Sequence, residues 1–352
     1  MTDALPDDTL DRMLALVDAD WRLRDAEPVE SGHSEVYRLA VDGAPAETYY
    51  LKCAHEGDGE GISADARIQR LLERRTEVPV TPVVGVVDDH PDLPAPFHLT
   101  EAVPGEALPY EAVGEVDDGV LRTLATDLGR ALGALHGPDV VDSFGYVASA
   151  GPALDGERPA GEASDLTVVR GREDWPAYLR ARVEYELDRH ADSRFSGLTD
   201  RLESWFDERI AALSGPFEPR LGRNDHGLHN VLLDPATGDL SALPDWAYTL
   251  AVPPAFDLEY AVYLYGGSFL AGLPAVRDRR SLVREALLTG YREINSELAE
   301  RVADPTPCYE LLAATRVMND FHHLRLPEGT EVAVADRLRE DVTAALDRTG
   351  QS

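Results

Sequence analysis

Asp225, Asn230 and Asp245 are three oxygen-bearing side chains within the stretch LGRNDHGLHNVLLDPATGDLSALPDW, residues 221–246. Asp225 precedes Asn230 by five residues, and Asp245 follows two short apolar runs that are separated by the turn sequence PATGD. If the two runs form a hairpin, the turn brings Asp245 back toward the loop that carries the other two residues. Carboxylate and amide oxygens suit a hard cation such as Mg²⁺, and a carboxylate that does not bind the metal can accept a proton from an attacking hydroxyl. Phosphoryl transfer requires such a grouping.

The chain contains 33 lysine and arginine residues, and Lys52 is the only lysine among them. It lies on the second strand of a hairpin that is predicted from two β-rich runs, EVYRLAV and ETYYLKCA, joined by the turn DGAPAE. The apolar residues beside it do not indicate an open surface. A solvent-exposed lysine without a function is the alternative, and the composition of the strand counts against it.

The loop RNDHGLHN and the sequence LPDWAY resemble the catalytic loop and the metal-binding aspartate of aminoglycoside phosphotransferases and choline kinase-like small-molecule kinases, which share the protein-kinase fold. The run DLGRALGALHG is similar to the helix before that loop, and the resemblance extends over residues 28–325. It implies a bilobal α+β fold and transfer of the γ-phosphate of ATP or GTP to a hydroxyl group of a small molecule. It also implies that Asp225 is the catalytic base, or orients the hydroxyl, while Asn230 and Asp245 hold Mg²⁺ on the nucleotide.

The same resemblance gives the lone lysine a role in nucleotide binding. Kinases of this fold place a lysine on the corresponding strand, where it contacts the α- and β-phosphates. That lysine pairs with a glutamate on the following helix, and by register Asp65 fills the position here with a side chain one methylene shorter. The loop ESGHSEVYR would supply backbone N–H groups to phosphate oxygens. Further nucleotide-binding candidates are four residues of this loop and two at the end of the last predicted strand: Ser31, Gly32, His33, Ser34, Glu101 and Val103.

The catalytic loop departs from the family pattern at two positions. The residue two before the catalytic aspartate is Arg223 instead of histidine, and the residue two after it is Gly227 instead of histidine. Such positions brace the loop, so we expect activity to be retained. His229 is either a shifted substitute for a missing histidine or a plain loop residue. Asp257, in AFDLEY, matches a family aspartate to which we assign a structural role.

The elements that must position these residues change character once along the chain. Residues 35–103 contain four β-rich runs and one helical stretch, ISADARIQRLLERR, whose apolar residues fall near one face. The segment 148–173 is predicted to be an exposed loop or insertion. We therefore predict a nucleotide-binding lobe over residues 1–103 and a helical lobe with the catalytic loop and substrate site over residues 104–352. Helices of the second lobe are predicted near residues 120–137, 174–190, 197–213, 255–265, 280–294, 308–324 and 331–347.

Composition excludes several classes of partner. The chain has 352 residues, of which 65 are acidic and 33 basic, and its formal charge is −32. This charge repels nucleic-acid backbones and anionic membranes, so neither is an expected partner. The many carboxylates and near absence of lysine also indicate a halophilic protein of a salt-rich cytoplasm, because salt screens the self-repulsion. Mutational bias toward arginine codons is the alternative explanation for the lysine count.

The sequence shows no secretory or membrane signal. Its start, MTDALPDDTL, is acidic and lacks the features of a signal peptide. The longest uncharged run, residues 260–276, falls short of the ~20 apolar residues that span a bilayer. Cys53 and Cys308 have no metal-binding spacing and suggest no disulfide framework. We expect a cytoplasmic protein.

Two further groups of residues invite a functional interpretation. His322 and His323 are adjacent, and neighbouring side chains on a helix point about 100° apart, which favours cap or core roles over metal binding. Aromatic and acidic residues could line a pocket for a cationic ligand, although core packing or plain solvation is the preferred interpretation. These residues are Trp246, Tyr248, Tyr263, Tyr265 and Glu259.

Three alternative functions are weaker. A protein Ser/Thr acceptor is disfavoured because RNDHGLHN lacks the Arg-Asp pair and the following lysine of protein kinases. A non-catalytic nucleotide-binding module would not need the catalytic aspartate and the metal ligands together with the lysine. A carboxylate-pair hydrolase would explain neither Lys52 nor the two-lobe pattern. Among small molecules, aminoglycosides, choline-like amines, sugars, macrolides and amino alcohols all remain open as acceptors.

Overall fold

The computed structural model describes residues 4–29, 34–54, 59–274 and 276–348. The chain forms two compact units, a β-rich one that contains the N-terminal region and a helical one that contains the C-terminal region, which confirms the predicted α+β fold class. The first unit consists of three segments: Met1–Pro104, Tyr146–Val169 and Ser241–Thr249. The second unit consists of the remainder: Gly105–Gly145, Arg170–Leu240 and Leu250–Ser352.

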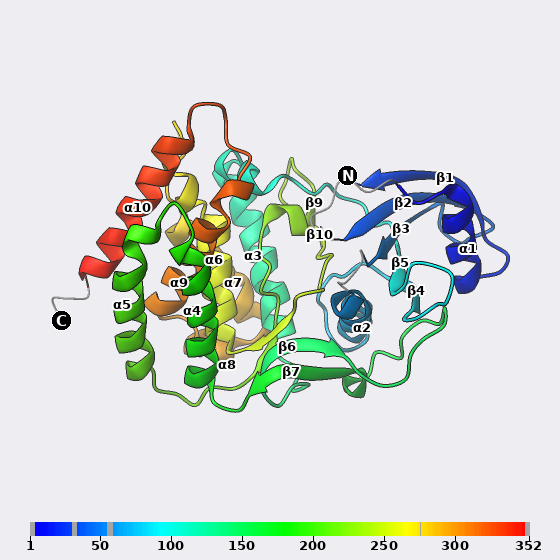
Figure 1. Ribbon diagram of the computed structural model, residues 1–352, viewed down its shortest axis with the longest axis horizontal. Helices are drawn as coiled ribbons and strands as arrows, with labels where there is room; N and C mark the ends of the chain where they lie inside the picture. Colours follow the sequence, from blue (N-terminus) through cyan, green and yellow to red (C-terminus); the bar gives the residue numbers. More distant parts are fainter. Residues whose placement is uncertain (1–3, 30–33, 55–58, 275, 349–352) are drawn as a thin grey trace. The chain divides into compact units, whose positions relative to one another are not determined.

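An antiparallel five-stranded sheet forms the centre of the first unit, with the strand order β1-β2-β3-β5-β4 (Figure 1). The predicted hairpin is formed by β2 and β3, and β3 pairs on its other side with β5. In this register His98 of β5 lies opposite Lys52 of β3. The middle strand β3 is therefore fixed by backbone hydrogen bonds on both sides. The strands are β1 (Arg22–Val29), β2 (Glu35–Asp42), β3 (Thr48–Cys53), β4 (Val83–Val87) and β5 (Phe97–Glu101).

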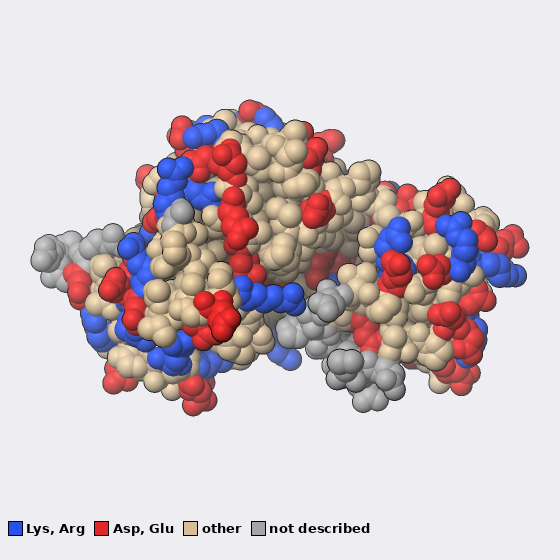
Figure 2. All heavy atoms as spheres, turned by 90° about the horizontal axis from the view of Figure 1, so that it is seen from above, with Lys and Arg blue, Asp and Glu red and all other residues tan. Residues whose placement is uncertain are grey.

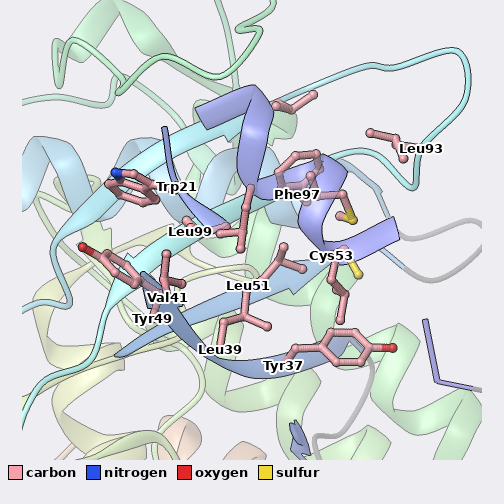
Figure 3. Close-up of a cluster of buried hydrophobic side chains, with 14 residues drawn as sticks. Trp21, Tyr37, Leu39, Val41, Tyr49, Leu51, Cys53, Leu93, Phe97 and Leu99 are labelled. Carbon is pink, nitrogen blue, oxygen red and sulfur yellow. The ribbon is translucent and has the colours of Figure 1, made fainter. Parts of the chain in front are cut away.

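The apolar core of the first unit lies between one face of this sheet and helix α1 (Asp7–Val17) (Figure 3). Side chains alternate between the two faces of a strand, so Leu39, Leu51 and Leu99 point into the core and are fully buried. Helix α1 contributes three buried residues: Leu10, Met13 and Leu14. Neither α1 nor β1 is predicted from the sequence. Most residues of β1 are exposed to solvent, and its sequence RLRDAEPV does not alternate between apolar and polar residues.

The opposite face of the sheet carries Lys52 and His98, and helix α2 (Gly59–Arg75) packs against the strands β3, β4 and β5. The apolar face predicted for this helix is buried. Its members are Ile62, Ile68, Leu71 and Leu72. Among its described residues the helix also buries four polar side chains: Ser63, Asp65, Arg67 and Gln69. A helix that buries so many polar groups must supply each with a partner.

Residues 152–162, which we call the strap, continue the sheet beyond β4. Val87 of β4 forms an antiparallel bridge with Asp155, and Gly156 N donates to the carbonyl oxygen of Val86 at 2.8 Å. Gly156 has a φ of 107°, and an added Cβ would lie 2.1 Å from a carbonyl oxygen of α1, so the position requires glycine. The strap thus covers a sheet edge that would otherwise expose unpaired backbone groups.

Side chains of α2 fasten the strap from the other side. Arg67 forms an ion pair of 2.7 Å with Asp88, and the same carboxylate accepts the backbone N–H of Leu154 at 2.6 Å. Arg70 Nε donates to the carbonyl oxygen of Pro159 at 3.2 Å. Many of residues 148–173 are exposed, as predicted, but the segment is more than a loop, because it contains strand β7 (Leu166–Arg172) and the hydrogen-bonded strap. Its Gly- and Pro-rich composition conceals hydrogen bonds to residues far away in the sequence.

Helices α3 (Asp118–Leu135) and α7 (Arg280–Ile294) pack closely against each other in the second unit (Figure 1). A Cβ atom on Gly129 would lie 2.1 Å from the carbonyl oxygen of Leu287, and one on Gly290 would lie 1.9 Å from that of Thr126. Glycine at both positions lets the two backbones approach. Both helices are predicted from the sequence.

Most of the remaining helices also agree with the prediction within a few residues. They are α4 (Trp175–Ala191), α5 (Thr199–Ala212), α6 (Pro254–Gly266), α9 (Pro307–Asn319) and α10 (Glu331–Arg348), to which the structure adds α8 (Ser296–Arg301). The further strands are β6 (Phe144–Ser149), β7 (Leu166–Arg172), β8 (Arg220–Gly222), β9 (Leu232–Leu233), β10 (Leu240–Ala242) and β11 (Leu250–Val252). Strands β9 and β10 pair, which confirms the hairpin predicted after Asn230. Short 3₁₀ helices include η1 (Tyr110–Gly114), η4 (Leu228–Asn230), η5 (Ser268–Leu270) and η6 (Phe321–His323).

The surface carries charges of both signs. On the face shown in Figure 2, Asp and Glu side chains are scattered among Lys and Arg side chains. None of the helices in the described ranges is long and apolar enough to cross a lipid bilayer. Cys53 and Cys308 are both buried and free.

Candidate active site

Lys52 lies at the centre of a buried group of charges in the first unit. Its Nζ donates a hydrogen bond to Asp65 Oδ2 and another to Asp245 Oδ1, each at 2.8 Å. The Lys52 side chain is 11% exposed and that of Asp65 is 1% exposed, whereas the Asp245 side chain is 38% exposed. One ammonium group therefore balances a buried carboxylate and a carboxylate that reaches solvent.

The burial of these groups shapes their pKa values. Burial alone would lower the pKa of Lys52, but the charges of Asp65 and Asp245 outweigh it and raise the pKa above its ordinary value. Burial would raise the pKa of Asp65, and the positive charge of Lys52 outweighs it, so the net shift is downward. Both partners are thus charged near neutral pH.

Asp65 is held by three further groups of the first unit. Its Oδ1 accepts the side-chain amide of Gln69 at 2.8 Å and the backbone N–H of Trp246 at 3.0 Å. His98 Nε2 lies 3.9 Å from Asp65 Oδ2. A Cβ atom on Gly61 would lie only 3.0 Å from the carbonyl oxygen of Ala247, so glycine lets α2 sit close to this segment.

Asp225 and Asn230 lie in the second unit, on the loop between β8 and η4 and at the end of η4. Asn230 Nδ2 donates to Asp225 Oδ2 at 2.9 Å. The Asp225 side chain is 45% exposed, whereas Asn230 is buried. The hydrogen bond fixes one carboxylate oxygen of Asp225 and leaves the group open to solvent.

A buried carboxylate on α6, Asp257, holds the backbone before Asp225. Its two oxygens accept the backbone N–H groups of Arg223 at 3.0 Å and of Asn224 at 3.1 Å. His226 Nε2 lies 2.9 Å from the same carboxylate, and His136 Nε2 of α3 lies 3.2 Å from it. Burial would raise the pKa of Asp257, but His226 and His136 outweigh it and hold the pKa well below its ordinary value.

Two arginines complete the support of the loop. The buried guanidinium of Arg223 donates to the carbonyl oxygen of Asn230. Arg316 of α9 donates to the side-chain oxygen of Asn224 at 3.1 Å and lies over the ring of Tyr260 at 5.4 Å. Asn224 has a φ of 61°, in the left-handed region that asparagine tolerates better than most residues. The residue directly before Asp225 is therefore fixed by both its backbone and its side chain.

The model of the phosphotransferase enzyme family matches residues 25–302 of the chain. The chain belongs to this family. It is thus a phosphotransferase with an alcohol group as acceptor, and the predicted family and enzyme class are confirmed. A comparison with curated protein sequences gives no match.

Solved structures resemble this phosphotransferase in fold. An apo thermostable mutant of aminoglycoside phosphotransferase APH(4)-Ia has a TM-score of 0.60 at 13% identity, over 99% of this chain and 100% of that one. A second such mutant, in a ternary complex with AMP-PNP and hygromycin B, has the same score and identity over 98% and 100% of the chains. The GDP complex of wild-type aminoglycoside 2′-phosphotransferase-IIIa has a TM-score of 0.57 at 15% identity, over 97% and 99%. At these identities the likeness concerns the fold.

The two predicted Mg²⁺ ligands of the phosphotransferase offer oxygen atoms of the expected kind. Asn230 uses its amide nitrogen toward Asp225 and keeps the amide oxygen for another partner, while Asp245 is a partly exposed carboxylate. Asn230 belongs to the second unit and Asp245 to the first. In the described part of the chain, no three His, Cys, Asp or Glu side chains gather as a metal site. A carboxylate oxygen and an amide oxygen are each of a kind that Mg²⁺ accepts as a ligand, so each residue by itself fits the predicted role.

The remaining predicted nucleotide-binding residues of the phosphotransferase lie in the first unit. Ser34 directly precedes β2, Glu101 ends β5 opposite Tyr49, and Val103 follows two residues later. Ser31, Gly32 and His33 lie outside the described residues. Their role in phosphate binding stays a prediction.

The other residues considered from the sequence fall mainly into the core. Trp246, Tyr263, Tyr265 and Glu259 are buried and Tyr248 is exposed, in agreement with packing and solvation. His322 and His323 lie on η6 with ring centroids 3.9 Å apart, and both are exposed. The core role considered for this histidine pair is therefore wrong, because the helix ends before it.

Sequence reasoning missed three residues that support the loop of Asp225, namely His136, His226 and Arg316, and it missed Gln69, which holds Asp65. The partners of Asp257 come from positions 121 and 31 residues away. The sequence signal that could have indicated them is a histidine at the end of a predicted helix, in LHG, and a histidine directly after Asp225.

Proposed function

We propose that this phosphotransferase uses ATP or GTP to phosphorylate a hydroxyl group of a small molecule. The observation that carries the proposal is the buried ammonium of Lys52, held between Asp65 and Asp245 at 2.8 Å. Burying a charged side chain costs desolvation free energy. Contact of the ammonium group with nucleotide phosphates would be a functional reason to keep the charge at this position. The only lysine of the chain is found at this position.

The nucleotide-binding role belongs to the first unit. Lys52 would contact the α- and β-phosphates, with Asp65 orienting the ammonium group, and the loop before β2 would cover the phosphates. The proteins of similar fold support a nucleotide ligand, since one is a complex with AMP-PNP and another a complex with GDP. Mg²⁺ held by Asp245 and Asn230 would neutralise charge on the phosphates.

The chemical step belongs to Asp225. Its exposed carboxylate would accept the proton of the acceptor hydroxyl while the oxygen forms a bond to the γ-phosphorus and the bond from phosphorus to the nucleotide oxygen breaks. Asn230 fixes one carboxylate oxygen, and the Asp257 network fixes the backbone. A small hydroxylated acceptor agrees with the hygromycin B in the APH(4)-Ia complex. A panel of hydroxylated small molecules would identify the acceptor.

The test is the turnover of Asp225→Asn. Hydroxylated metabolites and antibiotics are screened for acceptor-dependent release of ADP or GDP with Mg²⁺, and the variant is measured with the best acceptor. We expect kcat to fall by roughly 10²–10⁴, the usual contribution of a positioned base. Nucleotide affinity, measured by calorimetry, should change little because the carboxylate acts on the acceptor.

The matched control is Asp207→Asn, which makes the same change on an exposed position of α5. It should leave turnover unaltered. Near-normal turnover in Asp225→Asn would remove this residue from the role of base. Failure of the wild-type chain to bind either nucleotide would contradict the proposal as a whole.

A further inference from the structure

In the loop that carries Asp225, the imidazole of His229 fills the space that a side chain at position 227 would occupy. A Cβ atom on Gly227 would lie 2.7 Å from both Cε1 and Nδ1 of His229 and 2.9 Å from Cδ2 of Tyr110. The backbone does not require glycine here, because its φ of 166° is extended and open to any residue. Glycine at this position is therefore explained by space: it makes room for the imidazole of His229.

The imidazole that fills this space lies beside the proposed base. His229 Nε2 is 4.0 Å from Asp225 Oδ2, and both side chains reach solvent, with exposed fractions of 42% and 45%. The ring is held edge-on by Tyr110, with centroids 5.6 Å apart. Tyr110 in turn stacks on the buried Phe269 of η5 at 5.1 Å. The imidazole is thus packed on one side and open on the other.

Support of the loop does not account for this arrangement. The backbone around Asp225 is held by Asp257, Arg223 and Arg316, and the carboxylate by Asn230. A histidine that only filled space would not need a glycine two residues earlier, since a side chain at position 227 could fill the same space.

We propose that His229 is a further catalytic residue, which holds the acceptor hydroxyl against Asp225. The inference depends on the proposed function, in which Asp225 is the base. A separation of 4.0 Å is too long for a direct hydrogen bond, but an oxygen atom can lie about 2.8 Å from both groups at once. The imidazole N–H would donate to the hydroxyl oxygen while the hydroxyl donates to the carboxylate.

Each atom in the step has a defined destination. The hydroxyl proton passes to Asp225, the oxygen forms its bond to the γ-phosphorus, and the nucleoside diphosphate leaves with the electrons of the bond that breaks. His229 keeps its proton throughout. Its N–H orients the hydroxyl and stabilises the negative charge that develops on the oxygen as the proton leaves.

The first test compares His229→Ala with His229→Asn. We expect kcat of the alanine variant to fall about tenfold to a hundredfold, as for the loss of one oriented donor, and the asparagine variant to recover part of it because its amide retains an N–H. Nucleotide affinity and melting temperature should match the wild type in both. His323→Ala, an exposed histidine on η6, is the matched control and should behave as wild type.

The second test is a double-mutant cycle with Gly227→Ala. The added methyl group should displace the imidazole and lower kcat to a similar extent, whereas in the His229→Ala background it should cost little. Additive effects of the two substitutions would overturn the inference, as would full activity of His229→Ala. If Asp225→Asn is inactive while His229→Ala is fully active, only this inference fails. If Asp225→Asn is also active, the proposed function fails with it.

Discussion

Lys52 of the first unit and Asp225 of the second are both charged groups with a role in the proposed function, and their surroundings are opposite in kind. Lys52 is buried with two carboxylates at 2.8 Å, one of them 1% exposed. Asp225 is 45% exposed, its carboxylate accepts a hydrogen bond from the side chain of Asn230, and a histidine lies 4.0 Å away. A charge withdrawn from water must be balanced by the protein itself, whereas an exposed carboxylate can exchange water for a substrate. We therefore expect Lys52 to contribute to the stability of the fold as well as to the proposed function, and Asp225 to remain accessible to a substrate.

The sharpest way to break this comparison is to remove the buried cation. Lys52→Met keeps the length of the side chain and leaves Asp65 without its counter-charge. We expect the free energy of unfolding to fall by about 3–5 kcal/mol, the usual cost of leaving one member of a buried pair unbalanced. Urea unfolding monitored by tryptophan fluorescence measures it. Asp225→Asn, the control at the exposed group, should change the same free energy by less than about 0.5 kcal/mol.

A smaller effect is expected when the partly exposed partner of Lys52 is neutralised. Asp245→Asn should lower the Mg²⁺-dependent affinity for nucleotide by about 10- to 100-fold, a range typical of disturbing one group around a metal. Its effect on stability should be smaller than that of Lys52→Met, because Asp245 is 38% exposed and Asp65 remains paired. Calorimetric titrations with and without Mg²⁺ decide it. Equal affinities in variant and wild type would remove Asp245 from the metal site.

Exchange of one cation for another gives a finer test of the buried group. Lys52→Arg keeps the charge but replaces a compact ammonium by a larger planar guanidinium. We expect kcat/KM to fall by at least about tenfold, equivalent to ~1.4 kcal/mol of transition-state stabilisation, with little change in melting temperature. Kinetics within a factor of two of the wild type would mean that any cation serves at this position.

The mildest perturbation is a change of pH, which should act on the buried group through His98. Burial lowers the pKa of His98 below its ordinary value of 6.5, although Asp65, 3.9 Å away, and Asp245 oppose the shift and Lys52 adds to it. The unfolded chain therefore binds a proton more readily than the folded one. The stability from neutral His98 is fully present above about pH 6.5, declines as the pH falls, and is lost once the pH is below the folded pKa.

Urea unfolding at about pH 7.5 and about pH 5.5 measures this dependence. His98→Leu should lose stability less steeply between the two values than the wild type. His323→Ala, which removes an exposed histidine on η6, serves as the control. Identical slopes in His98→Leu and the wild type would show that this histidine does not sense the pH.

The sequence predicts the elements whose patterns repeat locally. The β2–β3 hairpin, the apolar face of α2 and most of the long helices carry periodic patterns over many residues, and the register of α2 suffices to pair Asp65 with Lys52. Strand β1 is joined to the sheet through its backbone and has little buried surface, so its side chains leave no pattern. The strap and the Asp257 network depend on hydrogen bonds between residues 31 to 121 positions apart, which no local periodicity encodes.

The order of segments in the first unit has a consequence for its biosynthesis. Asp245, on the third segment of this unit, stands 193 positions after the lysine that it binds. At a synthesis rate of about 5–20 residues per second, the ribosome needs roughly 10–40 s to bridge that interval. During this time the sheet has been synthesised while the last segment of its unit is still missing, and about half of the second unit is made first. The nascent protein therefore acquires a complete set of partners for Lys52 only late in translation.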